Sequence, residues 1–266
     1  MNARSITPLP GVSKVVDTVN SEAGATRATT REIMVETPVA LVFNGTTAAV
    51  MMATPADIED FAHGFALTEG YIAGLSDIES FETHHHASGI EARFWVTDER
   101  AEAIAERRRM IAGPVGCGLC GIDSLDQVHR ALSPVIGQID LTEDKIAAST
   151  TDIKAWQPLK DLTRSTHAAG FYLPGQGIIA AREDVGRHNA LDKLIGALAQ
   201  GGEDASRGAM VLTSRVSVEL VQKCAVSGAP MLIAASGPTS LAIETARTLG
   251  VTLIGFCRDG RFERFT

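Results

Sequence analysis

The sequence predicts an α/β protein with a mixed or parallel sheet in its C-terminal half and a smaller α+β part before it. In the C-terminal half, short apolar runs alternate with segments whose apolar residues recur at helical spacing, which is typical of βαβ units. In the N-terminal half, two apolar runs flank the turn pair Asn44-Gly45, which indicates a β-hairpin. The chain has 266 residues, enough for one large domain or two small ones.

Composition divides the chain into three parts. Residues 1–30 are rich in Ser, Thr, Ala and Gly without periodicity, so we expect a flexible N-terminal segment. Residues 31–135 should form the α+β part, which ends in a loop that holds two cysteines. Residues 136–266 should form the α/β part.

In the α+β part, a helix is expected just after the hairpin. Thr54 suits its N-cap, Pro55 the first helical position, and Asp57 a capping box. Apolar residues at helical spacing then continue to about Gly70. The other elements expected here are strands at 38–43, 47–52 and 93–97 and a helix at 99–111.

The α/β part should contain strands and helices in alternation. The strands are expected at Gly177–Ala181, Ala209–Thr213, Met231–Ala235 and Val251–Phe256. The helices are expected at His188–Ala199, Val216–Val226 and Ser240–Leu249. Gly250 stands where a helix commonly ends in a left-handed glycine. We expect the strands to lie parallel with helices packed on the sheet faces.

Charge and composition exclude several classes of function. The formal net charge is −8 and the pI is near 5.4, so we expect no nucleic-acid partner. No apolar run approaches the roughly 20 residues of a membrane span, and the first 30 residues lack a secretory signal. We therefore expect no membrane partner. Four cysteines in a chain of this length suggest a reducing cytoplasm rather than a disulfide scaffold.

Polar residues gather directly after each expected strand of the α/β part. Arginine, glycine and small hydroxyl residues recur in the stretches 182–189, 213–215, 236–240 and 257–261. Ligands of open α/β sheets bind at the carboxyl ends of the strands, and these residue types hold phosphate. The pattern predicts an anionic ligand, in particular a nucleotide. The alternative interpretation, for each stretch considered on its own, is that its residues only cap the helix that follows.

Histidines and charged residues in these stretches allow two interpretations. Asp184, Arg187 and His188 form the densest polar cluster, which either binds the ligand or knits the loops together. His167 is either a ligand contact or a core histidine. Three adjacent histidines at 84–86 cannot all face one metal, so we expect them in a solvated loop.

The run Gly116-Cys117-Gly118-Leu119-Cys120-Gly121 could bind a metal, cycle between dithiol and disulfide, or carry sulfur as a persulfide. Structural zinc needs four ligands, and Cys224 and Cys257 do not repeat the spacing, although His129 is a conceivable third ligand. A thioredoxin-like role would place the motif after an early strand, whereas here it follows a charged helix.

Zinc nucleobase deaminases are a further class to test, since they combine His-x-Glu with Pro-Cys-x-x-Cys. No histidine of this chain is followed two residues later by glutamate, and Gly116 replaces the proline. Deaminase chemistry therefore lacks its proton shuttle and one ligand. A sulfur carrier remains, because the flanking glycines suit a loop that must reach two partners in turn.

The motifs together resemble the formate dehydrogenase accessory sulfurtransferase family. The most specific match is the run Arg182-Glu-Asp-Val-Gly-Arg-His-Asn-Ala-Leu-Asp-Lys193. The other matching stretches are 44–45, 52–55, 61–65, 69–70, 117–121, 166–168, 213–215, 236–240 and 255–258. Ser165 departs from the family, which often has glycine beside the Thr-His pair.

The resemblance implies a cytidine-deaminase-like three-layer sandwich, a homodimer and a role in sulfur transfer. Such a protein accepts sulfur from a cysteine desulfurase as a persulfide. It passes the sulfur to the molybdenum of the bis(molybdopterin guanine dinucleotide) cofactor before that cofactor enters formate dehydrogenase. By this resemblance, Cys117 carries the persulfide and Cys120 assists, without a metal of the protein's own.

The expected cofactor-binding residues combine the family segment with the strand-end stretches. They are Phe256, Cys257, Arg258, Asp259, Gly260, Arg261, Arg187, His188, Ser214 and Arg215. The alternative functions are a cofactor-binding chaperone that donates no sulfur and a zinc-stabilised binding module.

Overall fold

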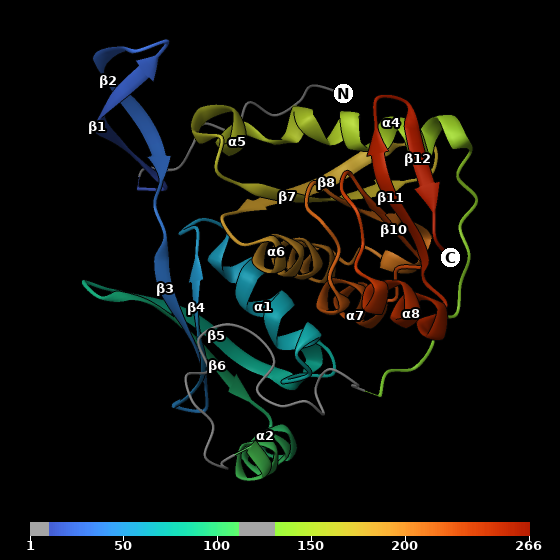
Figure 1. Cartoon of the computed structure of the whole chain (residues 1–266). Coiled ribbons are helices and arrows are strands. Elements are labelled where there is room, and N and C mark those ends of the chain that lie inside the picture. The colour runs from blue at the N-terminus through green and yellow to red at the C-terminus, as the bar shows by residue number, and fades with distance from the viewer. Residues whose placement is uncertain (1–10, 112–130) are drawn as a thin grey trace.

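A six-stranded mixed sheet forms the centre of the C-terminal part (Figure 1). This computed structural model describes residues 11–111 and 131–266. The strand order is β12-β11-β10-β9-β7-β8. The strands are β7 (His167–Leu173), β8 (Gly177–Asp184), β9 (Ala209–Leu212), β10 (Met231–Ala234), β11 (Thr252–Arg258) and β12 (Arg261–Arg264).

The direction of the strands decides where their ends lie. β9, β10 and β11 are parallel neighbours, while β7 is antiparallel to both β8 and β9. Because β8 and β9 are both antiparallel to β7, they run in the same direction as each other. The carboxyl ends of β8, β9, β10 and β11 therefore all lie at the same edge of the sheet. We call this edge the strand-end edge. The four strands expected from sequence are therefore parallel to one another, and β7 and β12, which the sequence did not predict, run the other way and make the sheet mixed.

Helices cover both faces of this sheet, as the three-layer prediction requires (Figure 1). One face carries α6 (Arg187–Gln200), α7 (Val218–Val226) and α8 (Ser240–Leu249). The other carries α4 (Glu143–Asp152), η2 (Ile153–Trp156) and α5 (Pro158–Thr163), and η3 (Ala205–Arg207) precedes β9. Met210 and Leu212 of β9 face the first layer, and Ala209 and Val211 face the second. Burial on both faces explains the continuous apolar runs in the sequence.

A second sheet of four strands, ordered β4-β3-β6-β5, forms the N-terminal core. Its strands are β3 (Thr37–Phe43), β4 (Thr46–Ala53), β5 (Ile78–His86) and β6 (Gly89–Val96). Asn44 and Gly45 both take positive φ values, 44° and 74°, which confirms the predicted hairpin turn. The remaining elements of this part are α1 (Ile58–Thr68), η1 (Leu75–Asp77) and α2 (Asp98–Ile111).

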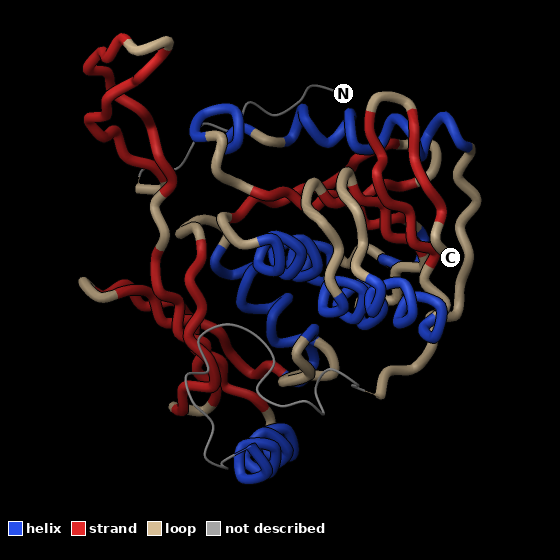
Figure 2. The backbone as a smooth tube through the Cα atoms, viewed as in Figure 1, coloured by secondary structure: helices blue, strands red, loops and turns tan. Residues whose placement is uncertain are grey.

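Helix α1 joins the two parts, because it packs between the four-stranded sheet and α6 (Figures 1 and 2). Phe61 and Phe65 lie in the N-terminal core, while Gly64 faces the backbone of α6. Two buried lysines add polar links across this junction. Lys193 of α6 donates to the Thr54 carbonyl, and Lys223 of α7 contacts Glu69 just after α1.

The start of the described chain differs from the expected flexible segment. β1 (Ser13–Glu22) and β2 (Ala25–Met34) pair antiparallel along their whole length and project from the rest of the protein (Figure 2). Valine and threonine favour extended backbone, and Ala23 and Gly24 take the positive φ values of a two-residue hairpin turn. The composition is polar because most of the ribbon is solvated, with Val15 and Val19 65% and 66% exposed.

Two local predictions in the N-terminal part are also corrected. Helix α1 begins at Ile58 after Asp57, so Thr54 is not its N-cap. Thr54 is instead buried, where its hydroxyl accepts a hydrogen bond from the Val185 amide and its own amide donates to Asp184. The three histidines at 84–86 lie on β5 rather than in a loop, where His84 is half-buried and His85 and His86 are exposed.

Candidate functional site

The four polar stretches predicted to meet at one edge do so, because the strands before them end there. Hydrogen bonds tie neighbouring loops together along this edge. The Val216 amide donates to the Gly237 carbonyl at 3.1 Å, and the Phe256 amide donates to the Ser236 carbonyl at 3.2 Å. The strand-end edge therefore presents one continuous set of loops and helix N-termini from β8 to β11.

His188 marks one end of this edge, in the first turn of α6. Its Nε2 lies 3.2 Å from Ser217 Oγ and 3.8 Å from Glu219 Oε2. The imidazole contact holds the pKa of the Glu219 carboxyl down at about 2. Sequence reasoning missed Ser217 and Glu219. Their signal was their place at the start of the helix after β9, where Ser217 is the N-cap and Glu219 lies in the first turn.

Arg187 precedes His188 in the chain, and Arg215 lies close enough to Arg187 for the two charges to interact. Burial and the charge of Arg215 lower the pKa of Arg187. The Arg187 Nε atom is buried without a hydrogen-bond acceptor among the described residues. Ser214, also predicted for this site, is buried and donates to the Arg215 carbonyl at 2.9 Å. Arg187 and Arg215 repel one another, and Arg187 lacks an acceptor for its Nε hydrogen within the described ranges. Both features favour the binding of an anion at this edge.

His167 lies at the same edge, which favours a ligand contact over a core histidine. It opens β7 opposite Asp184 and is half-buried rather than a core residue. Burial lowers the pKa of His167, and the charge of Arg187 lowers it further. A neutral ring therefore lies near Arg187 at about pH 7.

Much of the run from Arg182 to Lys193 is structural. Asp184 and Lys193, both with fully buried side chains, form an ion pair with Oδ2 and Nζ 2.7 Å apart. Asp184 also accepts hydrogen bonds from the Thr54 amide, the Gly186 amide and the Asn189 side chain. Of the three residues in the predicted polar cluster, Asp184 holds the loop, while Arg187 and His188 are half-buried at the edge.

The opposite end of the edge is the β11–β12 hairpin, which lines a shallow pocket of about 640 Å³. Five of the predicted residues line it together with Glu143, Phe262 and Glu263: Phe256, Arg258, Asp259, Gly260 and Arg261. Phe256 is 51% exposed although its φ is +49°, which is unusual for a bulky residue. A Cβ at Gly237 would come within 2.4 Å of its ring, so glycine is needed beneath it.

Cys257 does not belong to this pocket, since its side chain is fully buried on the opposite side of β11. Its Sγ donates to the Ile146 carbonyl of α4 at 3.2 Å. Burial raises the pKa of the Cys257 thiol, and it raises that of the buried Cys224 to about 12. Both thiols are therefore poor nucleophiles. Cys117 and Cys120 lie outside the described residues.

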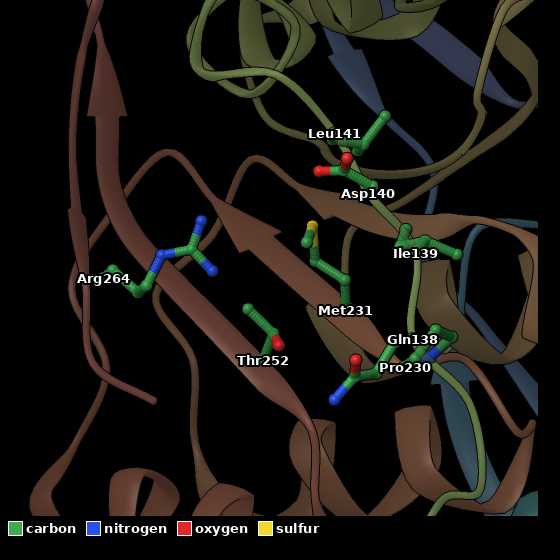
Figure 3. Close-up of a pocket in the computed structure, with 8 residues that line it drawn as sticks. All are labelled: Gln138, Ile139, Asp140, Leu141, Pro230, Met231, Thr252 and Arg264. Carbon is green, nitrogen blue, oxygen red and sulfur yellow. The ribbon is translucent and has the colours of Figure 1, made fainter.

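Another pocket, of about 260 Å³, lies at the other end of the central strands (Figure 3). Arg264 and Asp140 approach it from opposite sides, and Met231 and Thr252, the first residues of β10 and β11, lie between them. It contains none of the predicted site residues. Within residues 11–111 and 131–266, no group of three or more His, Cys, Asp or Glu side chains could hold a metal ion. No helix in those ranges is long and apolar enough to cross a bilayer.

Comparison with known sequences decides the family. The sequence model of the FdhD/NarQ family matches residues 34–266. The chain belongs to the FdhD/NarQ family. A relative from Agrobacterium fabrum named sulfur carrier protein FdhD is 48% identical over 89% of this chain and 88% of its own. A relative of the same name from Cupriavidus necator is 47% identical over 86% of this chain and 80% of its own.

A solved structure has the same fold as this chain. The crystal structure of a protein from Desulfotalea psychrophila, described as a formate dehydrogenase accessory protein, superposes with a TM-score of 0.74. The match covers 96% of this chain and 97% of the other at 24% identity. The family match confirms the resemblance inferred from the motifs, and the shared fold confirms the predicted α/β class.

Proposed function

We propose that this protein is a persulfide-carrying sulfurtransferase that sulfurates the molybdenum cofactor of formate dehydrogenase. The observation that carries the proposal is the 48% sequence identity to a relative named as a sulfur carrier protein, together with the Cys117–Cys120 pair. The donor would be a cysteine desulfurase, and the acceptor the bis(molybdopterin guanine dinucleotide) cofactor. The reducing cytoplasm is the compartment in which such thiols stay available.

Elimination among the four cysteines supports Cys117 and Cys120 as the carriers. Cys224 is buried in α7 and its pKa is raised to about 12, so it has almost no thiolate at neutral pH. Cys257 is buried against α4 and its pKa is also raised. The chain has four cysteines, so the remaining two are the candidates for nucleophilic sulfur chemistry.

The strand-end edge suits a long anionic ligand. From β8 to β11 there are four strand steps, so the edge is about 19 Å wide at the usual interstrand spacing. Arg187 and Arg215 stand towards one end, and Arg258 and Arg261 line the pocket at the other. One guanidinium group can donate hydrogen bonds to two phosphate oxygens at once. The ring of the exposed Phe256 can stack against a flat base. These residues fit a guanine dinucleotide.

The sulfur steps are those of persulfide exchange. The Cys117 thiolate attacks the outer sulfur of the donor persulfide, the donor S–S bond breaks, and the donor leaves as a thiolate. The Cys120 thiolate then attacks Cys117 Sγ, and the outer sulfur leaves with the bond pair as sulfide for the molybdenum. The resulting Cys117–Cys120 disulfide needs two electrons from a dithiol reductant before the next cycle.

Mass spectrometry tests the carrier role. After incubation with a cysteine desulfurase and cysteine, an added sulfur should appear on Cys117 in the wild type and be absent from Cys117→Ala. Cys224→Ala, which removes a thiol elsewhere, should still take up sulfur. Restoration of formate dehydrogenase activity in cells that lack the protein should fail for Cys117→Ala. Sulfur uptake and restored activity in that variant would overturn the proposal.

Nucleotide binding tests the acceptor site. Arg258→Ala and Arg261→Ala should each weaken GDP binding measured by calorimetry. The difference in affinity between wild type and variant should be smaller at high salt, because salt screens the attraction between the wild-type arginines and the phosphates. Lys14→Ala is a matched control, since it removes a cation from the projecting hairpin. Unchanged affinity in both arginine variants would remove the hairpin pocket from the site.

The second candidate is a chaperone that binds and delivers the cofactor without donating sulfur. The favouring observation is that the strand-end edge has binding groups of its own, none of which requires a cysteine side chain. Replacement of both Cys117 and Cys120 distinguishes the two functions. A chaperone would still activate the dehydrogenase, whereas a sulfurtransferase would not.

A further inference from the structure

We propose that β1 joins this chain to a second copy of itself. The β1 strands of the two copies pair antiparallel across a two-fold axis at Thr18, and the two hairpins together form one four-stranded sheet. We call each β1–β2 hairpin the ribbon, and the line along which the two β1 strands pair the seam. The inference is independent of the proposed function, because it uses no residue of the strand-end edge and no cysteine.

The ribbon has little to pack against in the single chain. Among the described residues it forms a sheet of its own and projects from the rest of the protein (Figure 2). Its base is anchored where Val12 and Met34 pack with Leu159 of α5, but every residue from 19 to 31 is exposed. A two-stranded hairpin on its own is marginally stable in water, and a third strand or a helix is needed to stabilise it. The ribbon therefore lacks a partner along most of its length.

The free edge of β1 can supply the hydrogen bonds for such a partner. Glu22 and Ala25 close the two-residue turn as a hydrogen-bonded pair, and along an antiparallel ladder such pairs alternate with pairs that are not hydrogen-bonded. The odd-numbered residues of β1 therefore direct their backbone N–H and C=O groups away from β2. They are Ser13, Val15, Asp17, Val19 and Ser21. An exposed row of this kind is a template for pairing with another strand.

β1 lacks two devices by which natural edge strands avoid pairing. It contains no proline, and its pairing with β2 runs without a bulge from Ser13 to Glu22. Charged side chains are a third such device, and Lys14 and Asp17 are both exposed on β1. The register of the seam decides whether these charges oppose pairing.

Two-fold symmetry leaves few registers for the seam. With Asp17 on the axis, the aspartates of the two copies would face each other, and like charges directly opposite are destabilising. With Thr18 on the axis, Lys14 faces Glu22 of the second copy at both ends of the seam, and opposite charges in such positions are stabilising. This register also pairs β1 from Lys14 to Glu22, which is nearly its whole length. The charges therefore select the register centred on Thr18.

The same register satisfies the free backbone groups of β1 and covers its apolar side chains. Val15 faces Ser21 of the second copy and Asp17 faces Val19, so the hydrogen-bonded pairs are made by residues whose backbone groups point outward. Val15 and Val19 are 65% and 66% exposed in the single chain. A strand added beside β1 reduces that exposure, which favours association. Backbone, charge and apolar surface all fit the same occupant, a second copy.

Proline substitution tests which edge of the ribbon is used. Val19→Pro removes a backbone N–H that points away from β2, so the ribbon keeps its own ladder while the seam loses one donor from each copy. Ala28→Pro is the matched control, since Ala28 pairs with Val19 and its N–H points to the opposite edge. In sedimentation velocity over a concentration series, the wild type and Ala28→Pro should associate alike. Val19→Pro should need about tenfold more protein to associate, or more.

Charge reversal tests the register. Lys14→Glu and Glu22→Lys should each raise the dissociation constant of the dimer about tenfold, because each places like charges opposite one another at both ends of the seam. The two changes in one chain restore opposite charges, so the double variant should associate within about twofold of the wild type. Arg27→Glu is the control, since Arg27 lies on β2 and faces Asn20 of its own chain. It should leave association unchanged.

A disulfide across the axis tests the register without a loss of binding. Thr18→Cys, in a chain that also carries Cys117→Ala and Cys120→Ala, places the two introduced thiols in a directly opposite pair with Cα atoms about 4.5 Å apart. That distance allows a disulfide, so mild oxidation should give a covalent dimer on a non-reducing gel. Asn20→Cys in the same background is the control. Its two thiols lie about 14 Å apart along the seam and should not link.

Several outcomes overturn the inference. They are wild-type association in Val19→Pro, equal loss of association in Val19→Pro and Ala28→Pro, and no more covalent dimer from Thr18→Cys than from Asn20→Cys. A wild type that stays monomeric at every concentration also overturns it, and would leave the β1 edge to an extended segment of another protein. Sulfur uptake and GDP binding are measured separately, so a failure here leaves the proposed function untouched.

Discussion

Gly64 of α1 and Gly196 of α6 face one another across the helix crossing that joins the two parts of the protein. A Cβ at Gly64 would lie 1.8 Å from the Asp192 carbonyl oxygen, and a Cβ at Gly196 would lie 2.0 Å from the Asp60 carbonyl oxygen. Both obstacles are backbone atoms of the other helix, which no side-chain rotation can move. The two helices therefore approach as closely as their backbones allow.

Alanine at either glycine should force the helices apart. We expect Gly64→Ala and Gly196→Ala each to lower the free energy of unfolding by about 3 kcal/mol, the upper end of the usual cost of overpacking. This is opposite to the gain that alanine gives in an open helix. Urea unfolding followed by circular dichroism measures the effect. Gly74→Ala, where the nearest atom beyond the chain neighbours is 3.8 Å away, is the control. Stability equal to that control would contradict the packing argument.

Lys193 should be essential for stability because its partner Asp184 is equally buried. Lys193→Met removes the cation and leaves the carboxylate in the protein interior, which should cost about 3–5 kcal/mol of unfolding free energy. Lys145→Met is the matched control, since Lys145 is exposed beside Asp144 and should change stability by less than about 0.5 kcal/mol. Combining Lys193→Met with Asp184→Asn should cost less than the sum of the two single changes. Additive costs would mean that the two groups do not interact.

Two thiols should resist alkylation in the native protein. Cys224 and Cys257 are fully buried with raised pKa values, so iodoacetamide at pH 8 should leave both unmodified for as long as the fold persists. Peptide mass spectrometry before and after denaturation measures this. Modification of either residue without unfolding would remove the elimination argument that leaves Cys117 and Cys120 as carriers.

Glu219 should make stability depend on pH in an acidic window. Its pKa is held at about 2 by His188, against 4.5 for an unperturbed glutamate, so folding favours the ionised form. The stabilisation is fully present above about pH 4.5 and is lost as the pH falls towards 2. The deficit of Glu219→Gln relative to wild type should therefore close across this range in urea unfolding experiments. Glu244→Gln should show no such trend. If the difference in unfolding free energy between Glu219→Gln and wild type stayed constant from pH 7 to 3, the charge of the carboxylate would not be what stabilises the fold.

The sequence predicted the α/β elements well because their signals are local. Apolar runs, the Asn44-Gly45 turn and the glycine that ends α8 each depend on a few neighbouring residues. β7 was missed because its segment, which begins at His167, reads as a short motif and pairs with strands far along the chain. The direction of β7 is a property of the sheet, which no local pattern encodes.

Site residues were predictable where a motif follows a strand. Arg187 and His188 were found in this way, whereas Glu219 was not, because its role arises from two helices that meet only in the fold. Cys257 was assigned to the site by its neighbours in sequence, yet along β11 its side chain is buried while those of Phe256 and Arg258 are exposed. Thr54 was read as a helix cap because its contacts are with Asp184 and Val185, which lie 130 and 131 residues further along the chain.

The lysines at the α1 junction also decide whether the protein can be divided. A chain cut between α2 and α4 would leave Lys193 and Lys223 in one fragment, while Thr54 and Glu69, which they contact, would remain in the other. Each fragment alone would also expose the apolar helix surface that the other covers. Split-protein reporters built on this chain should therefore be silent until both fragments are present together, and reassociation should require both fragments to fold at once.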